Sequence, residues 1–371
     1  MLSWVEIDSK AIKYNLKQFR RLIGPKVLLM PVIKANAYGH GFLEIAKICA
    51  ENKDVDRICV VNLDEAVELI KNKIKKSIQI LSFYELDNKK IYLAVKHNVI
   101  FPVYDITQVK FLDRVGERLE KNIKVHIKVD TGAARLGILP KQVIDFVKKI
   151  TKFKNIKIEG IFSHFASSED DKIYTEHQLN IFNKITEKLK QDGINIPIKH
   201  FACSAAGILY AQSRFNAIRI GVSMYGLYPD ELSRKKLHLK PALSWFTTII
   251  QIKTVPAWTK IGYGGSFTTK KITKLAIIPV GYWDGYDRRL SNNSEVIIKG
   301  KKCPVRGRIC MNLTIIDVSA VKNIKIGERV ILIGGKKNCS ITVDDIAHHA
   351  TTINYEVVDR INPLLIRVIK K

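Results

Sequence analysis

Short apolar runs alternate with amphipathic stretches through most of the chain's first 225 residues, and this alternation most limits the possible folds. The apolar runs are continuous, which is typical of strands buried on both faces of a parallel sheet. We expect strands at 26–34, 57–62, 77–81, 99–104, 124–130, 157–164, 199–204 and 218–222. Helical patterns lie between them, at 41–51, 63–72, 105–119, 140–151, 175–191 and 204–212. About eight strand-then-helix units of this length predict a (β/α)8 barrel.

The pattern changes after Pro229, where helical periodicity fades and β-rich runs separated by Gly, Pro and Asn turns take over. We expect strands at 244–255, 274–280, 295–299, 313–318 and 329–333, and a short helix at 342–350 capped by Thr342. The predicted fold class is therefore α/β, with a barrel domain at 1–230 and a mainly-β domain at 231–371. The first nine or so residues could pack with the β domain instead of the barrel.

A formal charge of +27 raises the question of nucleic-acid binding. The basic residues are scattered over helix ends and turns, lysine outnumbers arginine, and no basic strip is interleaved with aromatic residues. A solvated basic surface accounts for this pattern better than a nucleic-acid site does. We expect no nucleic-acid partner.

Two further features bear on the location of the chain. No uninterrupted apolar span is long enough for a membrane helix, and the first residues carry acids where a secretory signal carries bases. The six cysteines form no CxxC pair, so we expect mostly reduced thiols and no metal site. These features predict a cytoplasmic protein with no membrane association.

Reactive side chains fall at the ends of the expected barrel strands, which is where barrel enzymes carry their chemistry. They are Lys34, Arg135, His164, Ser204 and Arg219. Four of them also have an ordinary explanation. Lys34 could extend to solvent, His164 could be a core histidine, Ser204 could cap a helix and Arg219 could form a structural ion pair.

Taken together, these residues suit pyridoxal phosphate. A desolvated lysine has a lowered pKa and can form an imine. An imidazole can stack on the pyridine ring and an arginine can face its nitrogen. A serine hydroxyl at a helix start, with backbone amides around Gly221, can hold a phosphate.

Several motifs resemble the alanine racemase family, in family order from Trp4 to Arg367. They are Val32-Ile33-Lys34-Ala35-Asn36-Ala37-Tyr38-Gly39-His40-Gly41, His126-Ile127-Lys128-Val129-Asp130-Thr131-Gly132, Arg135-Leu136-Gly137, Arg219-Ile220-Gly221, Tyr225-Gly226-Leu227, Ile261-Gly262-Tyr263-Gly264, Pro279-Val280-Gly281-Tyr282-Trp283-Asp284-Gly285-Tyr286 and Cys310-Met311. The resemblance implies a pyridoxal 5'-phosphate enzyme that interconverts L-alanine and D-alanine, which supplies D-alanine for peptidoglycan.

The resemblance also implies a role for each matching residue. Lys34 would hold the cofactor in imine linkage, His164 would pack against the ring and Arg219 would bond its nitrogen. Arg135 would contact the phenolic oxygen of the cofactor and the substrate carboxylate, which the Met311 amide would also bind. The residues around the phosphate would be Tyr38, Ser204, Gly221, Val222 and Tyr355.

Racemisation needs a proton removed from one face of Cα and delivered to the other, so two bases serve it best. Lys34 would serve one face, and Tyr263 matches the family's opposite base. In the family this tyrosine reaches the active site of the other subunit, so the resemblance implies a homodimer with shared sites. Lys128 matches a lysine that is carbamylated in some members, which gives Arg135 an anionic partner.

Two residues depart from the family's pattern. Asn312 stands where the family usually has an aspartate, and Cys203 replaces an asparagine before Ser204. Three other functions are compatible with a barrel of this type: a pyridoxal-phosphate amino-acid decarboxylase, a racemase of broader specificity, and a non-enzymatic pyridoxal-phosphate homeostasis protein. The last class generally lacks the β domain that carries Tyr263.

Overall fold

The computed structural model describes residues 2–84, 87–336 and 338–370. It divides into two compact units. The barrel unit contains Ile12–Lys34 and Phe42–Lys240, and the β unit contains Met1–Ala11, Ala35–Gly41 and Pro241–Lys371. The chain passes from one unit to the other directly after Lys34 and returns after Gly41.

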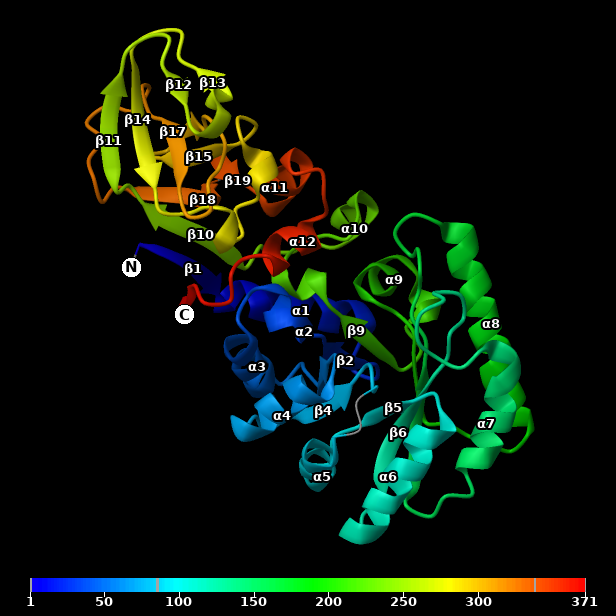
Figure 1. Ribbon diagram of the computed structural model, residues 1–371. Helices are drawn as coiled ribbons and strands as arrows, with labels where there is room; N and C mark the ends of the chain where they lie inside the picture. Colours follow the sequence, from blue (N-terminus) through cyan, green and yellow to red (C-terminus); the bar gives the residue numbers. More distant parts are fainter. Residues whose placement is uncertain (1, 85–86, 337, 371) are drawn as a thin grey trace. The chain divides into compact units, whose positions relative to one another are not determined.

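Among the residues that the structure describes, eight parallel strands form the barrel unit. Their arrangement can be followed in Figure 1. They are β2 (Leu28–Pro31), β3 (Arg57–Val60), β4 (Ser77–Ile80), β5 (Phe101–Val103), β6 (Ile123–Lys128), β7 (Ile156–Phe162), β8 (Ile198–His200) and β9 (Ala217–Ile220). Six of them pair in the order β2-β9-β8-β7-β6-β5, and β3 pairs with β4. Bridges from Val32 to Cys59 and from Gln79 to Ile100 close the ring. This confirms the predicted barrel.

Helices alternate with these strands. They are α1 (Ser9–Ile23), α3 (Phe42–Glu51), α4 (Leu63–Lys71), α5 (Asn88–Lys96), α6 (Ile106–Leu119), α7 (Val143–Ile150), α8 (Lys172–Gln191), α9 (Ser204–Leu209) and α10 (Glu231–Lys236). Carboxylate or amide caps fix several of their starts; for example, the Asp105 side chain accepts a bond from the Thr107 amide. In the described ranges, no helix is both long and apolar enough to cross a membrane.

The barrel strands are shorter than the apolar runs that predicted them. The run at 26–34 yields β2 at Leu28–Pro31, and the run at 199–204 yields β8 at Ile198–His200. The residues beyond these strand ends leave the ladder and form the segments that carry Lys34, His164 and Ser204, whereas Arg219 lies within β9. Apolar character alone does not distinguish a strand residue from a buried turn residue that follows it.

The β unit contains a seven-stranded sheet with the order β16-β15-β18-β10-β1-β20, in which β19 also pairs with β18. A three-stranded sheet has the order β11-β14-β17, and β12 pairs with β13. The bounds are β1 (Ser3–Asp8), β10 (Leu243–Thr248), β11 (Gln251–Val255), β12 (Lys260–Ile261), β13 (Phe267–Thr268), β14 (Thr273–Ile278), β15 (Glu295–Ile298), β16 (Lys301–Pro304), β17 (Thr314–Asp317), β18 (Arg329–Lys336), β19 (Cys339–Ile341) and β20 (Ile366–Lys370).

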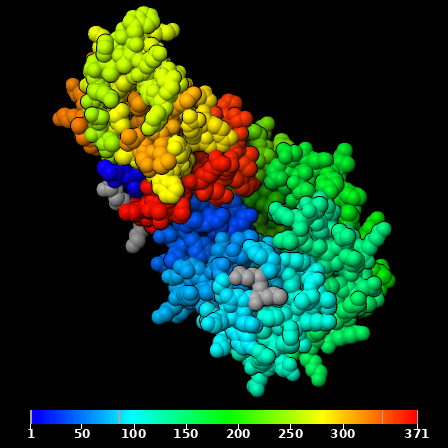
Figure 2. Space-filling view, viewed as in Figure 1, coloured from blue at the N-terminus to red at the C-terminus, as the bar shows by residue number. Residues whose placement is uncertain are grey.

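Strand β1 lies inside the larger sheet although it starts the chain. It pairs antiparallel with β10 and parallel with β20. In Figure 2 the blue N-terminal residues accordingly lie beside the red C-terminal ones. Both neighbours of β1 come from the far end of the sequence.

Two short helices, α11 (Val343–His349) and α12 (Asn354–Asp359), complete the β unit. The predicted cap is present: Thr342 Oγ1 accepts a bond from the Asp345 amide at 3.0 Å, and the Asp345 carboxylate accepts one from the Thr342 amide. The expected strand at 244–255 is instead two strands, β10 and β11, because the chain turns at Ile249 and Ile250 and changes sheets.

Candidate active site

Reactive side chains of the barrel unit gather at the C-terminal ends of its strands. Lys34, Lys128, Arg135 and Arg219 lie close enough to His164 for their positive charges to lower its pKa. Burial is the largest cause of that shift, and together these effects bring the pKa of His164 to about 3. The imidazole is therefore neutral at physiological pH, as a ring that packs on a cofactor would be.

Arg219, on β9, is the most deeply buried of these cations, with 4% of the residue exposed. Its Nη2 donates to the carbonyls of Ser163 at 2.6 Å and Phe201 at 3.0 Å, and its Nη1 donates to the carbonyl and to Nδ1 of His200. Burial lowers its pKa to about 10, so the guanidinium stays charged at neutral pH.

Within the part of the chain that the structure describes, Arg219 forms no ion pair, and its Nε–H donates to no protein group. The structural ion pair considered from the sequence is therefore absent there. A buried charge is costly unless acceptors surround it. An Nε–H donor left over in such a site suits a ligand acceptor such as a pyridine nitrogen.

Lys34 follows β2 and is half-buried. The backbone after it is unusual, because four consecutive non-glycine residues have positive φ: Ala35 at 52°, Asn36 at 51°, Ala37 at 53° and Tyr38 at 53°. L-residues avoid this left-handed region at a cost of about 1–2 kcal/mol each. Such strain persists only where surrounding structure imposes it, and it concentrates at functional sites.

The β unit holds this left-handed turn in place. A Cβ at Gly39 would lie 1.9 Å from the Val358 carbonyl oxygen, so only glycine fits there. The Arg367 guanidinium donates to the Gly39 carbonyl from Nε at 3.2 Å and from Nη2 at 3.0 Å. Within the same unit, the rings of Tyr38 and Tyr355 lie 6.2 Å apart.

Arg135 sits on a loop that Asp130 organises. The Asp130 carboxylate accepts bonds from the backbone amides of Gly132, Ala133, Ala134 and Arg135, at 2.9–3.1 Å. Although burial raises the pKa of Asp130, these four donors lower it overall. The carboxylate therefore stays ionised and fixes the backbone from which the exposed Arg135 side chain extends.

Ser204 is the first residue of α9, and its hydroxyl accepts a bond from the Gly221 amide at 2.9 Å. Cys203, not Ser204, occupies the N-cap position, so Ser204 does not cap the helix as the ordinary explanation supposed. Ser204 and Val222 are both buried. The structure thus brings Ser204, Gly221 and Val222 together at the ends of β8 and β9.

Tyr263 and Met311 lie in the β unit and are exposed, at 70% and 55%. Tyr263 begins a short turn flanked by Gly262, Gly264 and Gly265, all with positive φ. The Met311 backbone is fixed by its carbonyl, which accepts a bond from the Trp283 amide at 2.9 Å. A large exposed tyrosine on a glycine turn is typical of a side chain that contacts another molecule, and not of one that packs in its own core.

Comparison with known proteins identifies the family. A model described as the N-terminal domain of alanine racemase matches residues 7–229, and one described as its C-terminal domain matches residues 242–369. The chain belongs to the alanine racemase family. It is 41% identical to an alanine racemase from Methanococcus maripaludis, over 98% of both chains, and 41% identical to one from Clostridium tetani, over 98% of this chain and 94% of the relative.

Solved alanine racemase structures give the same result. One from Clostridium difficile 630 matches with a TM-score of 0.94 and 33% identity, covering 100% of this chain and 96% of the other. One from Bacillus anthracis with bound L-Ala-P matches with a TM-score of 0.91 and 32% identity, covering 100% and 95%.

The two departures from the pattern of the racemase family have different surroundings. Asn312 is exposed. Cys203 has its Sγ 3.2 Å from the Ser168 hydroxyl, which donates to the Glu169 carboxylate at 3.0 Å. Burial raises the pKa of the Cys203 thiol, so it is a packing group and not a nucleophile.

Sequence reasoning missed a set of buried polar groups below the racemase site. His200, His126 and Glu159 form a hydrogen-bonded series that starts at Arg219, with Arg57 and Gln79 beside it. The available signal was polar residues inside apolar runs that were expected to be buried strands. A histidine in the middle of the run at 124–130 needs a buried partner.

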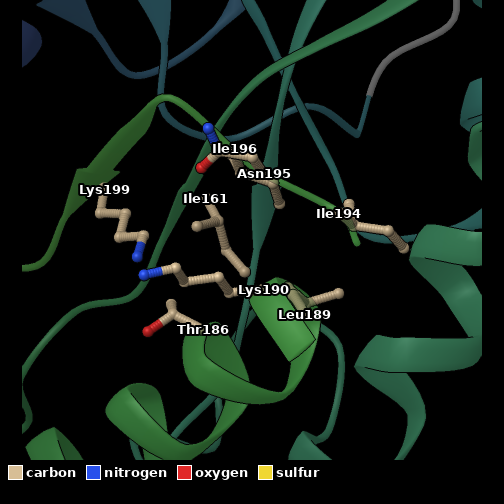
Figure 3. Close-up of a pocket in the computed structure, with 8 residues that line it drawn as sticks. All are labelled: Ile161, Thr186, Leu189, Lys190, Ile194, Asn195, Ile196 and Lys199. Atoms are coloured by element: carbon tan, nitrogen blue, oxygen red, sulfur yellow. The ribbon is translucent and has the colours of Figure 1, made fainter. Parts of the chain in front are cut away.

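Figure 3 shows a pocket of the barrel unit. It is lined by Ile161, Thr186, Leu189, Lys190, Ile194, Asn195, Ile196 and Lys199, mostly from the end of α8 and the segment leading into β8. None of the predicted site residues lines it. The reactive side chains at the strand ends, and not this pocket, therefore mark the candidate active site.

Proposed function

We propose that this chain interconverts L-alanine and D-alanine with pyridoxal 5'-phosphate as its cofactor. The observation that carries the proposal is the buried Arg219 cation, which faces acceptors but no carboxylate among the described residues. Membership of the alanine racemase family and the placement of Lys34 among the charges around His164 support it.

The residues of this chain would divide the work as follows. Lys34 holds the cofactor and exchanges a proton on one face of the substrate. His164 packs on the ring as a neutral imidazole, and Arg219 donates to the ring nitrogen. Ser204, Gly221 and Val222, together with Tyr38 and Tyr355, hold the phosphate.

The cofactor, when bound, would supply an electron sink for the pair left at Cα. Arg219 stays protonated, so the ring nitrogen would stay unprotonated. The electron sink would then be weaker than in an enzyme whose carboxylate keeps that nitrogen protonated. A weaker sink with a prompt proton return favours racemisation over transamination. Arg135 and the Met311 amide would orient the substrate carboxylate.

Tyr263 would hold or deliver the proton on the opposite face. We place it on the partner chain, so that the working unit is a homodimer with two shared sites. Its exposure on a glycine turn supports this assignment, because the side chain is available to a second copy.

The direct test is to incubate the purified protein with L-alanine, with and without added pyridoxal phosphate, and to measure D-alanine by chiral chromatography. We expect D-alanine to form until the two enantiomers are equal, and the same mixture to form from D-alanine. Release of CO2 would instead indicate a decarboxylase, and faster turnover of larger amino acids would indicate a broader racemase. No exchange of the Cα proton at saturating cofactor would overturn the proposal.

A further inference from the structure

Four side chains on four adjacent barrel strands form one continuous series of hydrogen bonds, which we call the Arg219–Glu159 relay. Arg219 on β9 contacts Nδ1 of His200 on β8. Nε2 of His200 lies 2.8 Å from Nδ1 of His126 on β6. Nε2 of His126 lies 3.1 Å from the Glu159 carboxylate on β7. His126, His200 and Arg219 are buried.

Only one proton arrangement satisfies the three contacts that join Arg219, His200, His126 and Glu159. A guanidinium has no acceptor, so Nδ1 of His200 must be the unprotonated nitrogen. Burial keeps both imidazoles neutral by lowering their pKa, to about 4 for His126 and well below the usual value for His200. His200 therefore carries its proton on Nε2 and donates it to Nδ1 of His126. His126 in turn carries its proton on Nε2 and donates it to the Glu159 carboxylate. The Gln79 amide nitrogen, 3.1 Å from Nδ1 of His126, agrees with an acceptor there. In this arrangement the two longer contacts, at 3.4 Å, from Arg57 Nη1 to Nε2 of His126 and from Gln79 Nε2 to Nε2 of His200, are not hydrogen bonds.

The pairing of the strands is irregular where the relay lies. Between β6 and β7 the register shifts after Val125, so that Val125 pairs with Ile158 and His126 pairs with Gly160. Glu159 is the extra residue, and it has no partner in the ladder. A bulge of this kind re-aims a side chain and often lies next to an active site. A Cβ on Gly160 would lie 2.4 Å from two atoms of the His126 ring, so the imidazole requires a glycine there.

Glu159 also pairs with Arg57 and Lys124, each at 3.0 Å. Although burial raises the pKa of Glu159, the bond from His126 and these charges lower it to about 2. The acid is therefore ionised throughout the physiological range. Glu159 is the carboxylate at the far end of the series of hydrogen bonds that starts at the buried Arg219.

We propose that Glu159, His126 and His200 are positioning residues for racemisation, because their one-way series of donors fixes the orientation of the Arg219 guanidinium. The inference rests on the proposed function only where Arg219 meets the cofactor. The proton arrangement of the relay is a property of the protein itself and can be measured without turnover.

The first test is to label the nine histidines with 15N and to record imidazole nitrogen shifts of the full chain as purified. Substitution of His126 or His200 by Asn would assign the signals. We expect both residues to be neutral, with Nε2 protonated and Nδ1 bare. A proton on Nδ1 of either one would overturn the relay, whatever the outcome of the racemase assay.

The second test compares Glu159→Gln with Lys124→Gln. The first removes the carboxylate that ends the relay, and the second removes a partner of that carboxylate but leaves it in place. We expect Glu159→Gln to shift the nitrogen signals of His200, two residues away along the relay, and the absorbance maximum of the bound cofactor. Lys124→Gln should leave both unchanged.

Glu159 would be a local structural residue if its substitution altered only His126. Unchanged His200 signals and an unchanged cofactor spectrum in folded Glu159→Gln would therefore overturn the proposal. If that variant does not fold, the tautomers of the unmodified chain still decide the question.

Discussion

Lys34 is the residue on which the proposed chemistry depends. It follows β2 and lies among the positive charges that act on His164. We expect borohydride treatment of the protein with pyridoxal phosphate to attach the cofactor to Lys34 irreversibly, and peptide mapping to recover the label there. Lys128 is an internal control, since it is a buried lysine whose pKa is lowered to about 8. A label on Lys128 or any other lysine would contradict the assignment.

Tyr263 should be separable from Lys34 in its effects. Tyr263→Phe keeps the ring and removes only the hydroxyl, so we expect the cofactor to bind while turnover falls by at least a hundredfold, as loss of a general acid–base group does. In deuterated water the variant should exchange the Cα proton of one enantiomer far faster than that of the other. Equal exchange of both enantiomers would indicate that one base serves both faces.

Lys128 has the chemistry for a reversible modification. Burial, followed by the charges of Arg135 and Arg219, lowers its pKa to about 8, and its Nζ donates to the Leu81 carbonyl at 2.9 Å. The neutral amine reacts with CO2, so carbamylation should increase as the pH rises through 8 and reverse below it. We expect 13C-bicarbonate to give a carbamate signal at pH 9 that is weak at pH 6. The signal should be absent from Lys128→Arg, and its persistence there would place the carbamate on another lysine.

At the scale of elements, the bulge in β7 can be tested by adding one methyl group. Gly160→Ala would place a Cβ against the His126 ring, so we expect the free energy of unfolding to fall by about 1–3 kcal/mol, the usual cost of overpacking. Chemical denaturation would measure it. Gly207→Ala in α9 is the matched control, because its Cβ would find the nearest atom at an ordinary 3.6 Å. A Gly160→Ala chain as stable as the control would show that the ring has room to move.

Elements differ in how far the sequence predicts them. The eight barrel strands follow from continuous apolar runs, since burial on both faces favours apolar side chains at successive positions. The short strands β12, β13, β16 and β19 were not predicted, because no continuous apolar run marks them. The cap at Thr342 was predicted, since it depends on local hydrogen bonding alone.

The residues of the candidate site also differ in how far the sequence predicts them. Lys34, His164 and Arg219 are visible in the sequence because each interrupts or ends an apolar run. The role of Glu159 is not visible, because it depends on a register shift between β6 and β7 that no local pattern encodes. The left-handed turn from Ala35 to Tyr38 was equally hidden, since alanine and tyrosine do not favour positive φ.

At the scale of the whole molecule, the shared site predicts complementation. Lys34→Ala and Tyr263→Phe chains are each expected to be inactive as homodimers. Unfolded and refolded together, they should form mixed dimers with one complete site, made of Lys34 from one chain and Tyr263 from the other. Random pairing makes about half of the dimers mixed, so roughly a quarter of the unmodified activity should return.

The control is each variant refolded alone and then combined without further unfolding, which should show no recovery if subunits do not exchange. Activity of the co-refolded sample no higher than that control would show that each site is built within one chain. Size-exclusion chromatography of every sample would confirm that dimers formed.

The position of β1 inside the larger sheet has a consequence for synthesis of the chain. β1 ends at Asp8, while its neighbours β10 and β20 begin at Leu243 and Ile366. At translation rates of about 5–20 residues per second, the first strand leaves the ribosome on the order of ten to fifty seconds before β10 exists. Its backbone donors and acceptors are without their sheet partners throughout that interval. Most barrel strands, in contrast, pair with neighbours that emerge soon after them, and the exception is β2, whose partner β9 begins at Ala217. Nascent chains stalled before residue 243 should therefore carry, near their N-terminus, an unpaired strand with apolar side chains at Val5 and Ile7, where a chaperone could bind it.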